Sequence, residues 1–69
     1  MRLKELRKEN QYTQQFVAEY LNIKQNTYSQ YENEQRQIPI SQLMMLAKLY
    51  DVSVDYILEL TKLHYFKMK

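Results

Sequence analysis

A short polar stretch in the first half of the chain concentrates hydrogen-bonding side chains. It contains Lys24, Gln25, Asn26 and Gln30. Each Asn or Gln amide carries both a donor and an acceptor, so neighbouring amides can make paired hydrogen bonds to a partner. The same composition is also typical of a helix face that is only exposed to water. The secondary structure around this stretch therefore has to be predicted before a binding surface can be distinguished from a solvated one.

No constellation in the sequence has the chemistry of an enzyme. Glycine and cysteine are absent, which excludes a glycine-rich phosphate loop, a disulfide and a thiolate metal site. His64 is the one histidine and has no partner for metal binding or for a nucleophile–base pair. We therefore expect no enzyme, no metal, no cofactor and no small-molecule ligand.

Length and composition favour one small domain. A chain of 69 residues forms a single core and buries only ~60% of its unfolded surface. The net charge of +2 is weak evidence for a nucleic-acid partner, although basic residues gather near the N-terminus and in the tail after residue 61. No apolar run approaches the ~18 residues of a membrane span, and the first residues do not form a signal peptide. A cytoplasmic protein is expected.

Hydrophobic spacing predicts an all-α fold, a compact bundle of five short helices. The first covers residues 2–9, and the second follows an N-cap at Thr13 and ends near Leu21. The third covers residues 24–32 and precedes a polar loop at 33–37. The fourth begins at Pro39 and ends at Asp51, and Ser53 caps the fifth. Residues 61–69 could extend the fifth helix, form a short ribbon or fray.

The expected core lies on the inner faces of these helices. Its predicted members are Leu3, Leu6, Val17, Ala18, Leu21, Tyr28, Tyr31, Leu43, Leu46, Ala47, Tyr50, Val54, Tyr56, Ile57 and Leu58. Most tyrosines fall on these inner positions, so packing explains them better than base stacking does. Phe16 and Tyr20 share one face of the second helix, where they are expected to cover the apolar tail or to join a subunit contact.

The second and third helices have the signature of a helix-turn-helix. Two short helices are joined by a tight turn, and the second of them is polar on its outer face. Ala18 is small enough to let the helices touch, and Asn22 tolerates the positive φ that the turn needs. Ile23, Tyr28 and Tyr31 supply apolar anchors for the third helix.

At this point the sequence resembles the phage repressor and Cro-type helix-turn-helix regulators. The matching segments are LKELR at 3–7, TQQ at 13–15, VAE at 17–19, YEN at 31–33, IPI at 38–40, LA at 46–47 and DVSVDYIL at 51–58. The resemblance covers residues 2–58 in order and spacing. It implies a lambda-repressor-like DNA-binding domain over residues 1–60, followed by a tail at 61–69 that is a possible dimer contact.

The resemblance implies a role for particular positions. Lys24, Gln25, Asn26 and Gln30 occupy positions whose side chains enter the major groove, where an Asn or Gln amide can bind adenine in a bidentate way. Gln14, Thr27, Asn33 and Arg36 lie where the family contacts the DNA backbone. Arg7 and Glu32 match a salt bridge between the first and third helices, although they could also be two unrelated surface charges.

The sequence departs from the family at its turns and at one helix start. Gln11, Asn22, Glu34 and Asp51 stand where family members often have glycine, and a non-glycine residue with positive φ is strained there. Lys24 replaces the usual Ser or Thr cap of the third helix. This loses a cap worth ~1 kcal/mol and places a cation beside the DNA.

The function expected from this resemblance is sequence-specific binding to double-stranded DNA as a bacterial or phage transcriptional regulator. A repressor that occupies its operator is the favoured form, acting as a homodimer on half-sites about 34 Å apart. The tail and the fifth helix are the candidate dimer surface, although the tail could instead fold back on its own subunit. The alternative function is an antitoxin that binds a partner protein and autoregulates its operon.

Overall fold

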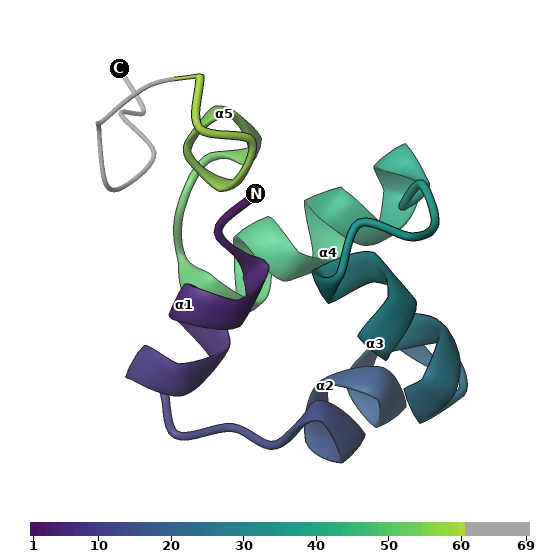
Figure 1. The fold of residues 1–69 in the computed structure, drawn as a ribbon. Helices are drawn as coiled ribbons and strands as arrows, with labels where there is room; N and C mark the ends of the chain where they lie inside the picture. Colours follow the sequence, from purple (N-terminus) through teal and green to yellow (C-terminus); the bar gives the residue numbers. More distant parts are fainter. Residues whose placement is uncertain (61–69) are drawn as a thin grey trace.

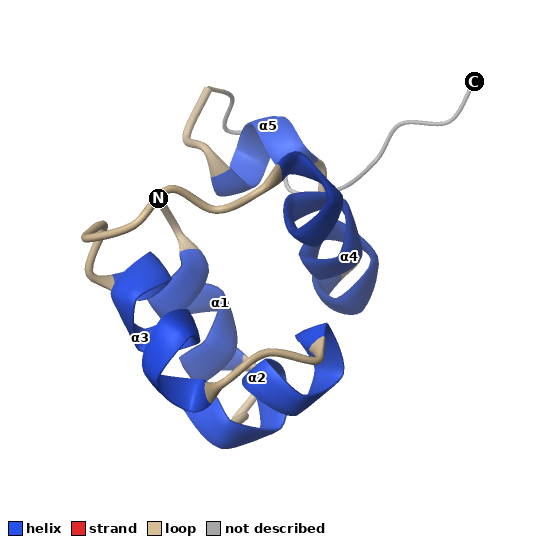
Figure 2. Ribbon diagram, turned by 90° about the vertical axis from the view of Figure 1, so that its right-hand side faces the viewer, coloured by secondary structure: helices blue, strands red, loops and turns tan. Residues whose placement is uncertain are grey.

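Residues 1–60 form five α-helices, as the sequence predicts (Figure 1). The computed structural model describes residues 1–60, so the expectations for the tail at 61–69 lie outside the described residues. The helices are α1 (Leu3–Glu9), α2 (Gln14–Leu21), α3 (Gln25–Glu32), α4 (Ile40–Tyr50) and α5 (Val54–Ile57). Figure 2 shows α1, α2 and α3 grouped on one side of the molecule and α4 and α5 on the other.

A single hydrophobic core joins all five helices. Its buried residues are Leu3, Leu6, Val17, Ala18, Leu21, Tyr28, Tyr31, Ile38, Leu43, Leu46, Ala47, Tyr50, Val52, Tyr56 and Ile57. The predicted members Val54 and Leu58 are only partly buried and pack against its edge. Ile38 and Val52 are core residues that helix periodicity did not predict, because they lie in the connections rather than on a helix face.

The predicted caps at Thr13 and Ser53 are confirmed, but α1, α3 and α4 each begin one residue later than predicted. The Thr13 hydroxyl accepts a hydrogen bond from the Phe16 N–H at 3.0 Å, and the Ser53 hydroxyl accepts from the Tyr56 N–H at 3.0 Å. Such bonds satisfy amides that have no partner within the helix. Pro39 is the N-cap of α4 and not its first helical residue, so the predicted start was one residue early. Lys24 is the N-cap of α3 and provides no side-chain cap.

Each of the five helices is followed by a residue with positive φ, and none of these residues is glycine. They are Gln11, Asn22, Glu34, Asp51 and Glu59, with φ between 56° and 65°. The first four are the positions at which the resemblance places glycine. After α2, the Asn22 N–H donates to the Glu19 carbonyl and the Ile23 N–H donates to the Ala18 carbonyl, both at 3.0 Å. This pair of bonds is a Schellman motif, which reverses the chain and turns α3 across α2.

Candidate nucleic-acid interface

Helix α3 has an inner face that the protein holds and an outer face that it leaves exposed. Tyr28 and Tyr31 are buried, with 0% and 4% of their surface accessible. Lys24, Gln25 and Asn26 are exposed. Within residues 1–60, none of these three side chains makes a hydrogen bond or an ion pair. The exposed amides are therefore free to bind an external partner, while the tyrosines fix the helix that carries them.

The remaining residues expected at DNA surround this face. Gln30 and Thr27 are partly buried on α3, and Asn33 and Arg36 are exposed in the segment that follows it. Gln14 is the first residue of α2 and is partly buried. The start of α2 lies beside the end of α3, where the Gln14 side chain contacts Glu32.

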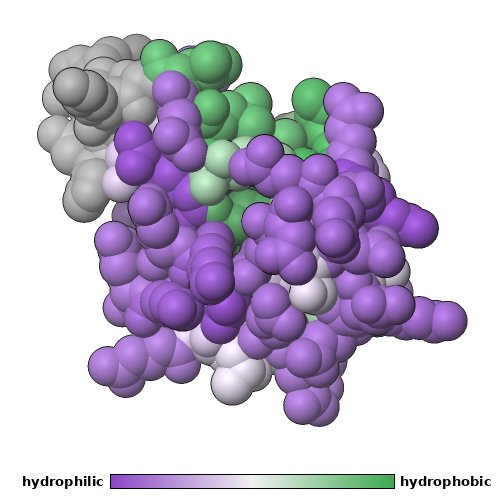
Figure 3. Space-filling view, in the orientation of Figure 1, coloured by the Kyte–Doolittle hydropathy of each residue, from purple (hydrophilic) through white to green (hydrophobic). Residues whose placement is uncertain are grey.

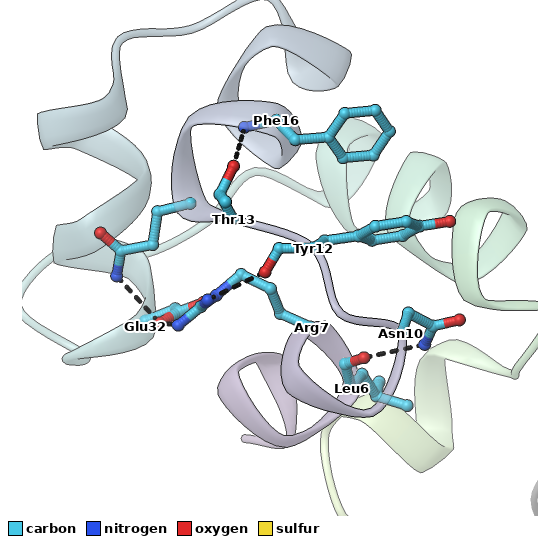
Figure 4. Close-up of polar contacts among 8 residues, drawn as sticks. Leu6, Arg7, Asn10, Tyr12, Thr13, Phe16 and Glu32 are labelled. Atoms are coloured by element: carbon cyan, nitrogen blue, oxygen red, sulfur yellow. Dashed lines mark hydrogen bonds and ion pairs between the residues drawn. The ribbon is translucent and has the colours of Figure 1, made fainter.

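The expected partners Arg7 and Glu32 form a bidentate ion pair between α1 and α3 (Figure 4). The Arg7 Nε lies 2.6 Å from Glu32 Oε2, and the Arg7 Nη2 lies 3.2 Å from Glu32 Oε1. Their side chains are only 12% and 1% accessible. The Arg7 Nη1 also donates to the Tyr12 carbonyl at 3.1 Å, so this guanidinium joins α1, the following turn and α3. An ion pair this well buried and hydrogen-bonded is screened from solvent and fixes the end of α3.

The pair perturbs the ionisation of the groups around it. Burial raises the pKa of the Glu32 carboxyl, but the hydrogen bonds from Arg7 and Gln14, together with the neighbouring Tyr28 hydroxyl, outweigh burial and hold this pKa below its usual value. The hydrogen bond to Glu32 raises the pKa of Arg7. Burial, and then the neighbouring Glu32 carboxylate, raises the pKa of Tyr28 far above its ordinary value. Arg7 and Glu32 therefore stay charged, and Tyr28 stays neutral, at neutral pH.

Sequence reasoning missed the contact between Gln14 and Glu32. The Gln14 Nε2 donates to Glu32 Oε1 at 3.1 Å, across 18 positions of sequence. The resemblance assigns these residues to separate roles, one at a phosphate and one in the ion pair. No local pattern links them, since only the packing of α2 against α3 brings them together.

Apolar residues are also exposed away from α3. Hydrophilic residues dominate the face drawn in Figure 3, and apolar residues gather along its upper edge near α5 and α4. Ile40, Met44 and Leu60 are 69%, 56% and 72% accessible. Phe16 lies against Tyr12, with 4.5 Å between ring centroids, and the Tyr20 hydroxyl donates to the Met45 carbonyl at 2.8 Å. The predicted contact of Phe16 and Tyr20 with the tail falls outside the described residues.

Residues 1–60 contain no pocket and no group of His, Cys, Asp and Glu side chains that could hold a metal ion. None of the described helices is long and apolar enough to cross a membrane. The exposed face of α3 is thus the strongest candidate for a functional surface among these residues.

Comparison with known proteins gives the family. Residues 3–57 match the family described as helix-turn-helix. The chain is 48% identical over 60 residues to the uncharacterized HTH-type transcriptional regulator YobD of Bacillus subtilis, covering 87% of this chain and 54% of that protein. It is 47% identical over 57 residues to the HTH-type transcriptional regulator ImmR of the same organism, covering 83% of this chain and 45% of that protein.

A third relative, the HTH-type transcriptional regulator AnsR of Bacillus subtilis, is 40% identical over 57 residues, which are 83% of this chain and 49% of AnsR. The chain spans about half the length of these curated relatives. No solved structure gives a significant match. The turn after α2, the buried inner face of α3 and these similarities agree, and the chain belongs to the helix-turn-helix family of Cro/C1-type DNA-binding transcriptional regulators.

Proposed function

We propose that this domain binds double-stranded DNA sequence-specifically by placing α3 in the major groove, and that it represses transcription by occupying an operator. The observation that carries the proposal is the division of α3 into two faces. Tyr28 and Tyr31 are buried, while Lys24, Gln25 and Asn26 are exposed and make no bond within residues 1–60. A rigid helix with free amides matches the donor and acceptor pattern of base edges in the major groove.

The proposed contacts divide by chemistry. Gln25, Asn26 and Gln30 bind base edges, because their amides pair with adenine or with other bases that offer a donor and an acceptor. Lys24 adds a positive charge close to the phosphates. A second set, which fixes the register of the protein without reading sequence, contacts the DNA backbone and consists of Gln14, Thr27, Asn33 and Arg36.

A single α3 contacts only a few base pairs, so selectivity requires a second copy. We place the domain in a cytoplasmic homodimer on a pseudo-palindrome with half-sites about 34 Å apart. Helix α5 and the residues after it are the candidate dimer surface, supported by the 72% accessibility of the apolar Leu60. Leu63 and Phe66 would extend this surface, and they lie beyond the described residues.

Selection of bound duplexes from a random DNA pool tests the proposal. We expect an enriched sequence with two-fold symmetry, whose half-site spacing matches one turn of DNA. Selection with Gln25→Ala should relax the base preference at one position of each half-site and reduce cognate affinity by ~1–3 kcal/mol. Gln37→Ala, which removes an exposed amide outside α3, is the matched control and should keep the wild-type preference. A pool that shows no enriched sequence would contradict the proposal.

A further inference from the structure

Gln14 begins α2 next to a buried negative charge, and this fixes the orientation of its amide. Its Nε2 lies 3.1 Å from Glu32 Oε1. The side chain of Glu32 is 1% accessible, so solvent offers that carboxylate oxygen no replacement donor. An ionised carboxylate only accepts hydrogen bonds, and the amide carbonyl of Gln14 would repel it. The NH2 group of Gln14 must therefore face Glu32, and the opposite flip of the amide is excluded.

The same contact leaves a donor available to an outside partner. An amide NH2 carries two hydrogens in the plane of the amide. Glu32 takes one of them, and the other has no partner within residues 1–60. The Gln14 side chain is only partly buried, so this second N–H can reach an acceptor in solution. A phosphate oxygen is such an acceptor, whereas an unrestrained amide could equally present its carbonyl oxygen, which repels phosphate.

Arg7 neutralises the negative charge of Glu32, which would otherwise repel a phosphate near Gln14. A bare carboxylate near the DNA backbone would repel phosphate, but the Arg7 guanidinium binds both oxygens of Glu32, at 2.6 and 3.2 Å. The pair is close to neutral as a whole, so Glu32 accepts the hydrogen bond from Gln14 without adding a net negative charge. The ion pair and the amide contact therefore work together at the junction of α1, α2 and α3.

We propose that Glu32 is a positioning residue for DNA binding, because its Oε1 holds the Gln14 amide with Nε2 as a donor toward a backbone phosphate. The inference rests on the proposed function and adds to it the residue that orients one of the phosphate contacts. Glu32 does not touch DNA in this scheme. It acts through Gln14, and it does so in the free protein before DNA arrives, which lowers the ordering cost of the contact.

The first test measures the Gln14 amide in the intact chain by NMR. Its two side-chain NH2 protons should have well-separated shifts, and they should titrate together with the Glu32 carboxyl, whose pKa lies below its usual value. Arg7, Tyr28 and Tyr50 are the other ionisable groups around Glu32. None of them changes charge in the acidic range, so the assignment is unambiguous. Gln14 resonances at free-amide positions, insensitive to acid, would overturn the proposal.

The second test measures DNA affinity on the selected operator and on a random duplex. Gln14→Met should lose about tenfold in affinity on both DNAs, as expected for a hydrogen bond to a charged group. Its salt dependence should not change, because no charge is removed. Gln15→Met alters the exposed neighbouring amide, which contacts Glu19 and not Glu32, and should bind like the wild type. Equal affinities of the two variants would overturn the proposal.

Glu32→Asp separates positioning from folding. It keeps the charge for Arg7 but withdraws the acceptor by one methylene, so the Gln14 resonances should return to free-amide positions and affinity should fall by the same factor on both DNAs. If this variant does not fold, the wild-type titration and the Gln14→Met comparison still decide the matter. A wild-type chain that binds no DNA would contradict the proposed function itself, whereas its NMR titration would separately report the orientation of the amide.

Discussion

The two faces of α3 differ in how many of their side chains are buried or hydrogen-bonded within the protein. On the inner face, Tyr28 and Tyr31 are buried and Glu32 has hydrogen bonds from two other helices. On the outer face, Lys24 and Asn26 are exposed and unpaired within residues 1–60, and the helix lacks a side-chain cap. The inner face therefore contributes to stability, and the outer face is left free for binding. Substitutions on the two faces should separate these contributions.

The largest effect is expected on the inner face. Glu32→Ala leaves the Arg7 guanidinium buried without its carboxylate, and removing one partner of a buried pair typically costs ~3–5 kcal/mol. Urea unfolding of the variant and the wild type measures this loss. Glu9→Ala removes an exposed carboxylate from the end of α1 and should stay within about 0.5 kcal/mol of the wild type. Equal stability of Glu32→Ala and Glu9→Ala would show that the ion pair does not hold α3.

The next effect belongs to the outer face and should leave folding untouched. Asn26→Ala removes one exposed amide, so the free energy of unfolding should change by less than about 0.5 kcal/mol. Binding to the selected operator should weaken by ~1–3 kcal/mol, with little change on random DNA. Urea unfolding and fluorescence anisotropy on both duplexes measure the two quantities. A large loss of stability would break the division between the faces.

Lys24→Ser, at the boundary of the two faces, should make the domain more stable but weaken its binding to DNA. A Ser hydroxyl at the N-cap can accept from an amide of the first turn of α3, so unfolding should require ~1 kcal/mol more. Loss of the lysine charge should weaken binding to every duplex and reduce the salt slope by roughly 0.9, the value for one phosphate contact. Lys48→Ser, an exposed lysine on α4, should leave the salt slope unchanged. If both variants have the wild-type slope, Lys24 does not contact phosphate.

Acid should weaken the inner face selectively. The pKa of Glu32 is lowered in the folded protein, so the carboxyl contributes stability that is fully present above its ordinary pKa of 4.5. This contribution is lost as the pH falls from there through the lower pKa of the folded state. Unfolding curves over this range should decline more steeply for the wild type than for Glu32→Gln, which cannot titrate. If the free energy of unfolding falls equally with pH in the two proteins, Glu32 is not the source of the acid sensitivity.

The sequence predicted the elements of this fold better than their contacts. Helix positions follow from apolar spacing and from the Thr13 and Ser53 hydroxyls, which act within one turn of the chain. The start of α4 differs by one residue, because Pro39 is equally suited to the cap and to the first turn. Ile38 and Val52 were missed because a residue in a connection has no helical periodicity to reveal its burial.

For the candidate site, too, the sequence predicted individual positions better than the contacts between them. The exposed positions on α3 follow from its apolar inner face, because residues opposite Tyr28 and Tyr31 must meet solvent. The contact of Gln14 with Glu32 depends on the crossing of α2 and α3, which no local pattern specifies. The pairing of Arg7 with Glu32 came from the family resemblance alone, since their 25-residue separation offers no periodicity.

The five helix ends without glycine have a consequence for how this domain can be used. Gln11, Glu34 and Glu59 resist a left-handed backbone, so the local sequence gives the chain little reason to reverse direction at these points. Local backbone hydrogen bonds close each of these turns, and contacts between distant segments must compensate for the strain of the left-handed residue. A peptide that carries α1 and α2 alone should lose the bend at Gln11, and α3 transplanted into another scaffold should not keep its orientation. The exposed face of α3 is thus a property of the whole fold, inseparable from the helices beneath it.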